Sequence, residues 1–203
     1  MKEDFLCYPN KAAKHRLIML HGWGAEANDL IPLGRTILRN IELPFELISL
    51  EAPYLRPEGS GRQWYGLFPP DWLGVPKAIY DLKIRIEILG RDSIPLKDSI
   101  LLGFSQGAAM AISVGSNLPL GGIISCSGYP HPDLKFKRSI PPLLLSHGLN
   151  DDVVPIEASY KLEKLLKEGN HKYIFHSFKG GHEIPEGILP LICQNIENWL
   201  YGY

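Results

Sequence analysis

Hydrophobic residues fall into two alternating patterns along the chain. Short runs rich in leucine, isoleucine and valine predict buried strands at residues 17–20, 46–50, 99–103, 122–126, 143–146 and 173–178. Longer segments with a helical spacing of hydrophobic residues predict helices at residues 28–40, 77–89, 106–116, 156–167 and 186–200. Strands that alternate with helices form a mostly parallel sheet with helices on both faces. The expected fold class is therefore α/β.

Polar and glycine residues mark the ends of the predicted helices. Asn28 or Asp29 could cap the first helix, since a short polar side chain accepts a bond from the free N–H groups there. Gly90 and Gly169 stand just past the ends of the second and fourth predicted helices. A residue in the left-handed conformation commonly ends a helix at this position, and we expect it at both glycines.

Composition and charge narrow the class of protein. The chain has 203 residues, 45% of them hydrophobic, which is typical of one compact domain, so we expect a single domain over residues 1–203. Basic and acidic residues are scattered and give a net charge of −1, which leaves no basic stripe for a nucleic acid. The three cysteines are widely spaced and predict reduced thiols in a cytoplasmic protein.

The sequence also bears on membranes and assembly. The first residues, MKEDFLCYPNKAAKHR, lack the apolar core of a secretory signal. No segment approaches the ~20 apolar residues that span a bilayer, so we expect no integral membrane association. The apolar carboxyl-terminal stretch could pack in the core or against a second copy in a homodimer.

The stretch LLGFSQGAAM at residues 101–110 places Ser105 between Gly103 and Gly107, after a predicted strand and before a predicted helix. A serine at a sharp strand-to-helix turn presents its hydroxyl at the positive end of the helix, as a nucleophile requires. The glycines remove the β-carbons that would keep helix and strand apart. Because G-x-S-x-G also occurs by chance, a catalytic interpretation requires a base and an acid elsewhere.

A serine nucleophile needs a histidine base that a carboxylate orients. In hydrolases with this strand–turn–helix motif the acid follows the serine and the histidine comes last, which excludes His15 and His21. His171 precedes the last predicted strand, and His176 lies within it. His182 follows that strand on a glycine-rich loop, and we predict that it is the base.

Two candidates for the acid stand side by side. Asp151 and Asp152 follow a buried predicted strand. Adjacent side chains there point in different directions, so only one should reach the imidazole. The other is then a turn or cap residue before the next helix. The residues alone leave both assignments open.

Four blocks of the chain resemble one known family. They are HGWG at 21–24 with Asp29, GFSQG at 103–107, HGLNDDVVP at 147–155 and GGHEI at 180–184. In this order they are similar to the phospholipase/carboxylesterase family, which includes bacterial carboxylesterases and acyl-protein thioesterases. The resemblance implies an α/β-hydrolase fold that needs no metal or cofactor. It also implies hydrolysis of acyl esters or thioesters, with lysophospholipids and acylated proteins among the candidate substrates.

The resemblance also assigns roles to single residues. It matches Ser105 to the nucleophile and His182 to the base, and it selects Asp151 as the acid. Amide donors stabilise the oxyanion of the tetrahedral intermediate, and the amide of Gln106, directly after the nucleophile, is the first donor expected for this fold. The resemblance implies the amide of Trp23 as the second donor.

The residues that bind the substrate are predicted from composition and from the resemblance. Residues 51–76 are rich in proline, glycine and aromatic residues, and we predict that Trp64, Tyr65 and Phe68 line a groove for an acyl chain. Tyr129 stands near a place where family members often carry a tryptophan, and we predict that it contacts substrate too. The alternative for residues 51–76 is an Ω-type loop that packs down on the sheet.

The sequence is also compatible with two other functions. The same scaffold could hydrolyse another acyl substrate, such as a peptide or a lactone, because one fold hosts many chemistries. It could also be a catalytically silent binding protein. The serine, aspartate and histidine in the expected order argue against a silent scaffold. The chain has no room for a separate cap domain that would restrict the substrate.

Overall fold

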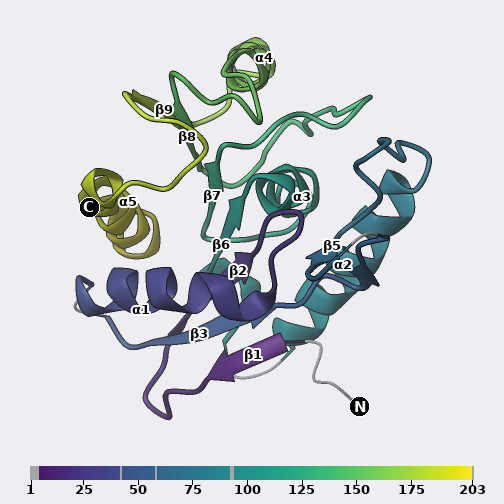
Figure 1. Cartoon of the computed structure of the whole chain (residues 1–203). Coiled ribbons are helices and arrows are strands. Elements are labelled where there is room, and N and C mark those ends of the chain that lie inside the picture. Colours follow the sequence, from purple (N-terminus) through teal and green to yellow (C-terminus); the bar gives the residue numbers. More distant parts are fainter. Residues whose placement is uncertain (1–4, 42, 58, 92–93, 203) are drawn as a thin grey trace.

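The computed structural model describes residues 5–41, 43–57, 59–91 and 94–202. A seven-stranded sheet runs through the molecule in the order β1-β3-β2-β6-β7-β8-β9, and β1 alone is antiparallel to its neighbour. The predicted α/β fold class is confirmed (Figure 1). The strands of this sheet are β1 (Phe5–Tyr8), β2 (His15–Leu20), β3 (Phe45–Leu50), β6 (Ser99–Phe104), β7 (Gly122–Cys126), β8 (Leu143–Gly148) and β9 (Tyr173–Phe178).

Helices connect the strands, and a small hairpin stands apart from the main sheet. The hairpin pairs β4 (Tyr54–Leu55) with β5 (Arg62–Gln63). The α-helices are α1 (Ile31–Arg39), α2 (Val75–Leu89), α3 (Gln106–Gly115), α4 (Glu157–Glu168) and α5 (Leu189–Tyr201), and the 3-10 helices are η1 (Ala27–Leu30), η2 (Leu96–Asp98) and η3 (Glu186–Ile188).

The central strands are buried on both faces, which explains their continuous runs of hydrophobic residues. In β2, Ile18 and Leu20 contribute to one core, while Leu17 and Met19 contribute to the other. Successive strand side chains point to opposite faces of the sheet, so one six-residue strand supplies both cores. The first core lies under α2, α3 and α4 and the second under α1 and α5, on the two sides of the sheet (Figure 1).

The carboxyl-terminal helix packs within its own chain. Ile192 and Ile196 of α5 are fully buried in the second core. This apolar stretch therefore packs in the core, which is one of the two arrangements expected from the sequence. No helix in the described ranges combines the length and the hydropathy that a membrane crossing requires.

Prolines shift the starts of two predicted helices. The helix predicted from residue 28 has a 3-10 turn first, and α1 begins at Ile31 with Pro32 in its first turn. The helix predicted from residue 186 likewise becomes η3 followed by α5, with Pro190 in the first turn. Proline has no N–H group to donate to the preceding turn, so the regular α-helical bonds begin after it.

The expected helix ends differ in detail. Of the two predicted cap residues, Asp29 accepts the N–H of Glu26 at 2.8 Å, although the 3-10 turn begins before both. The prediction of left-handed glycines was wrong. Gly90 and Gly169 have φ of −74° and −82°, and their N–H groups still bond the carbonyls four residues earlier.

The sheet topology positions the loops that matter for function. Strands β2, β3, β6, β7, β8 and β9 are parallel, so the loops after them leave the same edge of the sheet. Ser105 follows β6, Asp151 lies shortly after β8, and His182 lies shortly after β9. This is the edge at which α/β sheets commonly bind ligands.

Candidate active site

Ser105 forms the turn between β6 and α3. Its φ is 54° and its ψ is −118°, and a positive φ is unusual for a residue other than glycine. Its N–H donates to the carbonyl of Cys126 at the end of β7, at 2.9 Å. Strained residues of this kind cluster at functional sites, and the turn presents the serine at the N-terminus of a ten-residue helix.

The two flanking glycines allow this turn to form. A β-carbon at Gly103 would lie 2.3 Å from the carbonyl oxygen of Gly107. A β-carbon at Gly107 would lie 2.2 Å from the carbonyl oxygen of Leu20. Real β-carbons essentially never come so close to another atom, so α3 can pack on β6 and β2 only with glycine at both positions.

Asp151 and His182 are joined by a hydrogen bond. The Nδ1 of His182 lies 2.7 Å from Oδ2 of Asp151. A carboxylate can only accept, so Nδ1 is the donor, and in a neutral imidazole this tautomer has its free lone pair on Nε2. Of the two adjacent acids, the structure brings Asp151 to the imidazole and leaves Asp152 exposed.

The surroundings of Asp151 favour its ionised form. Burial by itself raises the pKa of this carboxyl, but the hydrogen bonds from His182 and from the Val154 N–H outweigh burial and hold the pKa below its usual value. Oδ1 accepts the N–H groups of Val153 and Val154 at 3.0 and 2.8 Å. The carboxylate is therefore a fixed negative charge that orients the imidazole.

Sequence reasoning missed one neighbour of this carboxylate. His147, fully buried near the end of β8, has its Nε2 2.7 Å from the Val154 carbonyl and 3.3 Å from Oδ2 of Asp151. Its Nδ1 lies 2.7 Å from Oγ of Ser159 in α4. A histidine near the end of a leucine-rich strand was the available signal, and its contacts place it as a support for the loop that carries Asp151.

Ser105 and His182 line one cavity of about 600 Å³. The two described side chains are not hydrogen-bonded to each other, and such bonds are often long before a substrate binds. The Phe104 ring packs 4.8 Å from the His182 ring, centroid to centroid. The remaining lining is mostly apolar: Gly22, Trp23, Ala25, Leu67, Phe68, Pro70, Trp72, Tyr129, Val153, Val154, Pro155 and Ala158.

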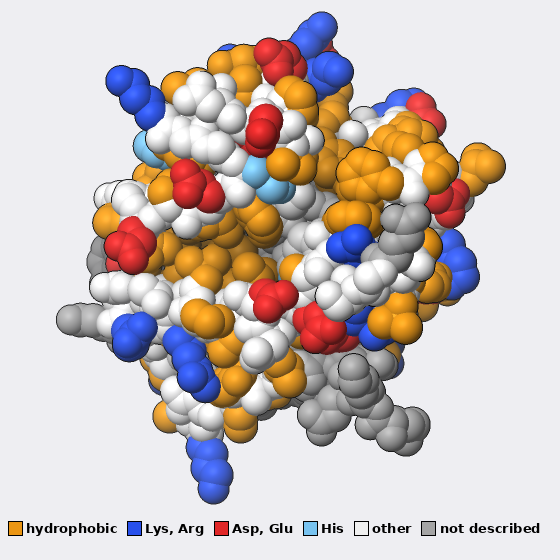
Figure 2. All heavy atoms as spheres, viewed as in Figure 1, with side chains coloured by type: hydrophobic (Ala, Val, Ile, Leu, Met, Phe, Trp, Pro, Cys, Tyr) orange, Lys and Arg blue, Asp and Glu red, His pale blue; other side chains and the backbone are white. Residues whose placement is uncertain are grey.

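The face of the molecule in Figure 2 carries part of this apolar surface. Hydrophobic side chains gather where Figure 1 shows the loop before α2, and a histidine is exposed near the centre of the face. Phe68 and Trp72 in this loop are 69% and 40% exposed. The rim of the cavity is therefore apolar on the side of this loop.

The two predicted oxyanion donors have free backbone N–H groups. In the part of the chain that the structure describes, neither Trp23 nor Gln106 donates its N–H to a backbone carbonyl. Trp23 lines the cavity beside Ser105, and Gln106 is the first residue of α3. Helix N-termini and unpaired amides stabilise negative charge, so both groups can bind an anionic oxygen.

The residues predicted to line the acyl groove divide into two pairs. Phe68 and Tyr129 line the cavity. Trp64 and Tyr65 are 1% and 2% exposed and pack in the first core, so the structure does not place their side chains on the groove. Residues 64–65 thus pack on the sheet, as the loop alternative predicts. Residues further along the same segment, such as Phe68, line the cavity, as the groove prediction states.

Tyr65 still reaches the cavity through Tyr129. The two hydroxyl oxygens are 2.6 Å apart, and Nε2 of His131 lies 2.8 Å from the Tyr65 hydroxyl. His131 in turn contacts the Ser113 hydroxyl of α3 at 2.8 Å. Burial lowers the pKa of His131 to about 4, so this chain of hydrogen bonds is neutral at physiological pH and ties Tyr129 to the core.

Among the residues whose structure is described, no group of three or more histidine, cysteine, aspartate or glutamate side chains could hold a metal ion. The polar groups of the candidate site are a hydroxyl, an oriented imidazole and two amides without a backbone partner in the described ranges, a set that can support acyl transfer.

Comparisons with known proteins place these features in a family. The model of the family described as Phospholipase/Carboxylesterase matches residues 2–200. Acyl-protein thioesterase 1 of Saccharomyces cerevisiae is 35% identical over 196 residues, which cover 83% of this chain and 85% of the yeast protein. A rice protein (Oryza sativa subsp. japonica) named as a probable carboxylesterase is 31% identical over 144 residues, which cover 66% of this chain and 53% of the rice protein.

A solved structure shows the same fold. The crystal structure of esterase PE8 is 30% identical in sequence and superposes with a TM-score of 0.86, covering 96% of this chain and 98% of that one. The expected α/β-hydrolase fold is thereby confirmed. Within the described residues, no segment between the strands forms a separate cap domain.

The close packing at the serine turn leads to a prediction about stability. Gly107→Ala should lower the free energy of unfolding by about 2 kcal/mol or more, because the added methyl group overlaps the carbonyl oxygens of Leu20 and His21. Gly187→Ala is the matched control, since a β-carbon there meets nothing within 4 Å, and its effect should stay within about 0.5 kcal/mol. Chemical denaturation measures both, and equal stabilities of the two variants would contradict the packing described here.

Proposed function

Since the chain belongs to the phospholipase/carboxylesterase family, we propose that it is a serine hydrolase that cleaves carboxylic esters or thioesters through an acyl-enzyme intermediate. One observation carries this proposal more than any other. The His182 imidazole, oriented by Asp151 at 2.7 Å, lines the same cavity as Ser105, which sits at a strained strand-to-helix turn.

In the proposed first half-reaction, Oγ of Ser105 attacks the acyl carbonyl carbon and its proton passes to Nε2 of His182. The carbonyl oxygen becomes an oxyanion, to which the N–H groups of Trp23 and Gln106 donate. The intermediate then collapses, the bond to the leaving oxygen or sulfur breaks, and His182 returns its proton to the departing alcohol or thiol. Ser105 is left acylated.

In the second half-reaction water takes the place of the alcohol or thiol. His182 removes a proton from the water, and the resulting hydroxide attacks the acyl-enzyme. The second tetrahedral intermediate uses the same two amides and collapses to release the carboxylic acid and restore the Ser105 hydroxyl. Asp151 stays ionised throughout and stabilises the imidazolium that forms twice.

The cavity supports an apolar acyl group as the recognised part of the substrate. Apart from Ser105 and His182, its lining is almost wholly apolar, and burial of each methylene contributes about 0.8 kcal/mol. The relatives named as carboxylesterases and acyl-protein thioesterases fit this class of substrate. We extend it to small acyl esters, lysophospholipids and acylated proteins as substrates of this chain.

The two adjacent acids provide the test of the mechanism. The parent should hydrolyse p-nitrophenyl acetate, and Asp151→Asn should lower kcat by about 10⁴-fold, because the amide can no longer hold His182 in the reactive tautomer. Asp152→Asn is the control, since Asp152 is exposed, and it should stay within about threefold of the parent. Steady-state kinetics on the folded variants decide the assignment. Losses in the reverse order, or a parent without esterase activity, would refute it.

A second prediction concerns acyl chain length. With p-nitrophenyl esters of increasing length, kcat/KM should rise over the first several carbons and then level, as the cavity fills. Phe68→Ala should flatten this rise, because Phe68 lines the cavity and packs edge-on against the Trp23 ring at 4.9 Å. It should leave acetyl hydrolysis nearly unchanged, because Phe68 is not one of the groups proposed to react.

The control for Phe68 is Leu73→Ala on the same loop. Leu73 is 95% exposed and is not part of the cavity lining. The dependence of kcat/KM on acyl chain length in Leu73→Ala should therefore match that of the parent. An unchanged profile in Phe68→Ala would show that the loop before α2 does not contact the acyl chain.

A further inference from the structure

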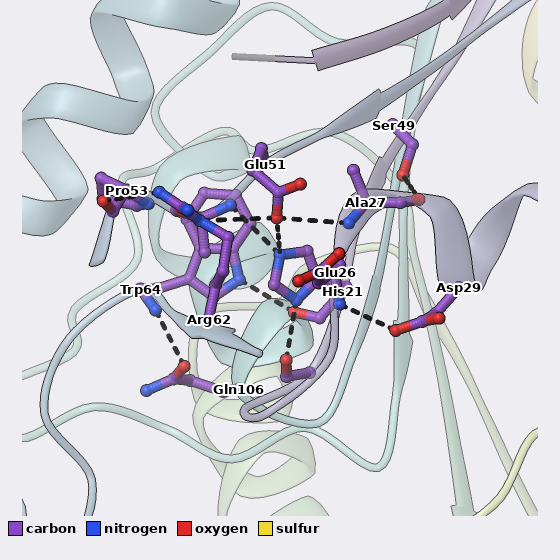
Figure 3. A network of polar contacts seen from close by, with 12 residues as sticks. His21, Glu26, Ala27, Asp29, Ser49, Glu51, Pro53, Arg62, Trp64 and Gln106 are labelled. Atoms are coloured by element: carbon purple, nitrogen blue, oxygen red, sulfur yellow. Dashed lines mark hydrogen bonds and ion pairs between the residues drawn. The ribbon is translucent and has the colours of Figure 1, made fainter. Parts of the chain in front are cut away.

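Gln106 has a second set of contacts besides its backbone N–H. Its side chain is fully buried and bonds one neighbouring segment with both of its polar groups. Oε1 accepts the Trp64 N–H at 3.0 Å, and Nε2 donates to the Tyr65 carbonyl at 2.8 Å. Figure 3 shows the first of these bonds. The residue after the candidate nucleophile thus holds residues 62–65, which we call the strap.

Trp64 connects the strap to the loop after β2. Its indole Nε1–H donates to the carbonyl of His21 at 2.8 Å (Figure 3). Its ring also packs against the His21 imidazole, with centroids 5.5 Å apart. One buried residue therefore bonds the helix end that carries Gln106 through its N–H, and the loop that carries Trp23 through its side chain.

The strap pairs directly with the backbone around Trp23. The Gly24 N–H donates to the Arg62 carbonyl at 2.8 Å, and the Arg62 N–H donates to the Ala25 carbonyl at 3.0 Å. The Trp23 indole donates to Oε1 of Gln63 at 3.1 Å. The strap thus contacts the residues that follow Trp23 and the Trp23 side chain itself.

Polar contacts fix the other side of the strap (Figure 3). The Arg62 guanidinium donates to the Ala52 carbonyl and lies 3.6 Å from the Glu51 carboxylate. Glu51 also accepts the Ala27 N–H at 3.3 Å. Burial lowers the pKa of His21, so its neutral ring accepts the Ala52 N–H, at 3.1 Å. The strap, the loop after β2 and the loop after β3 form one hydrogen-bonded unit.

We propose that the Gln106 side chain is a positioning residue for the oxyanion site: through Trp64 and the strap it sets where the Trp23 N–H stands relative to the Gln106 N–H. The inference rests on the proposed function, in which these two amides bind the oxyanion. The two donors come from segments far apart in sequence, and the Gln106 side chain links them by two hydrogen bonds to the strap. Displacement of a catalytic group by about 1 Å can cost about 10²-fold in rate.

Two variants weaken this link at different points. Gln106→Leu keeps the approximate size of the side chain and removes both bonds to the strap. Trp64→Phe keeps a buried ring and removes the indole N–H that bonds His21. Each should lower kcat on p-nitrophenyl acetate by about 10- to 100-fold and leave KM within about threefold, because the oxyanion exists only in the transition state. The double variant should lose little more than Gln106→Leu alone.

A transition-state analogue separates this role from general destabilisation. Phenylboronic acid forms a tetrahedral adduct with a serine hydroxyl, so its Kd should rise in each variant by the same factor by which kcat/KM falls. Asn195→Leu is the control: Asn195 is a buried amide that donates to the Leu191 carbonyl within α5. It should lower the free energy of unfolding while kcat and the Kd of phenylboronic acid stay at parental values.

The outcomes are distinguishable. Folded Gln106→Leu with parental kcat, or a loss of kcat without a matching rise in the Kd of phenylboronic acid, would overturn the positioning role. If Gln106→Leu does not fold, Trp64→Phe gives the same decision. A parent that neither hydrolyses the ester nor binds phenylboronic acid would instead overturn the proposed function itself.

Discussion

The direct contact of helix α3 with strands β6 and β2 is the constraint on which the candidate site depends. Without a β-carbon at Gly103 and Gly107 the helix backbone approaches the β2 carbonyls, which no other residue type allows. This approach places Ser105 at the sheet edge in a turn with a positive φ. It also brings the first amides of α3 next to the loop after β2, so that the hydroxyl can face the carbon and the two amide donors the oxygen of one substrate carbonyl group.

The other parts of the site are held in place relative to this contact. Asp151, in the loop after β8, is held by two backbone N–H groups and supported by His147. From there it orients His182 in the loop after β9. On the opposite side the strap bonds Gln106 and the Trp23 loop together. The groups proposed to react thus lie on short loops that hydrogen bonds hold in place. The apolar loop before α2 lines the cavity beside them.

Local patterns in the sequence were sufficient for the six parallel strands, the α-helices and the serine turn, because each is encoded by neighbouring residues. The hairpin strands β4 and β5 were missed, since two residues give no period that can be recognised, and the edge strand β1 was missed as well. Aromatic composition marked residues 51–76 as a cover but could not separate Trp64 in the core from Phe68 at the cavity. That difference arises from the bonds of Trp64 to Gln106 and His21, which are contacts between distant segments.

The choice between Asp151 and Asp152 had a similar origin. Both follow the same strand, and only the three-dimensional path of the β9 loop decides which carboxylate meets His182. The resemblance to a family selected Asp151, and the 2.7 Å hydrogen bond between His182 and Asp151 agrees with that choice. His147 was overlooked because its partners, the Val154 carbonyl and Ser159, become neighbours only when the loop after β8 folds back.

The proposed mechanism requires Ser105 to be the nucleophile, and covalent labelling tests this claim. A fluorophosphonate should form a bond from phosphorus to the serine oxygen with loss of fluoride, and peptide mapping by mass spectrometry should find the phosphonyl group on Ser105 alone. The Ser105→Ala variant should stay unlabelled. A parent that hydrolyses acyl esters but carries the adduct on another residue, or carries none, would contradict the claim.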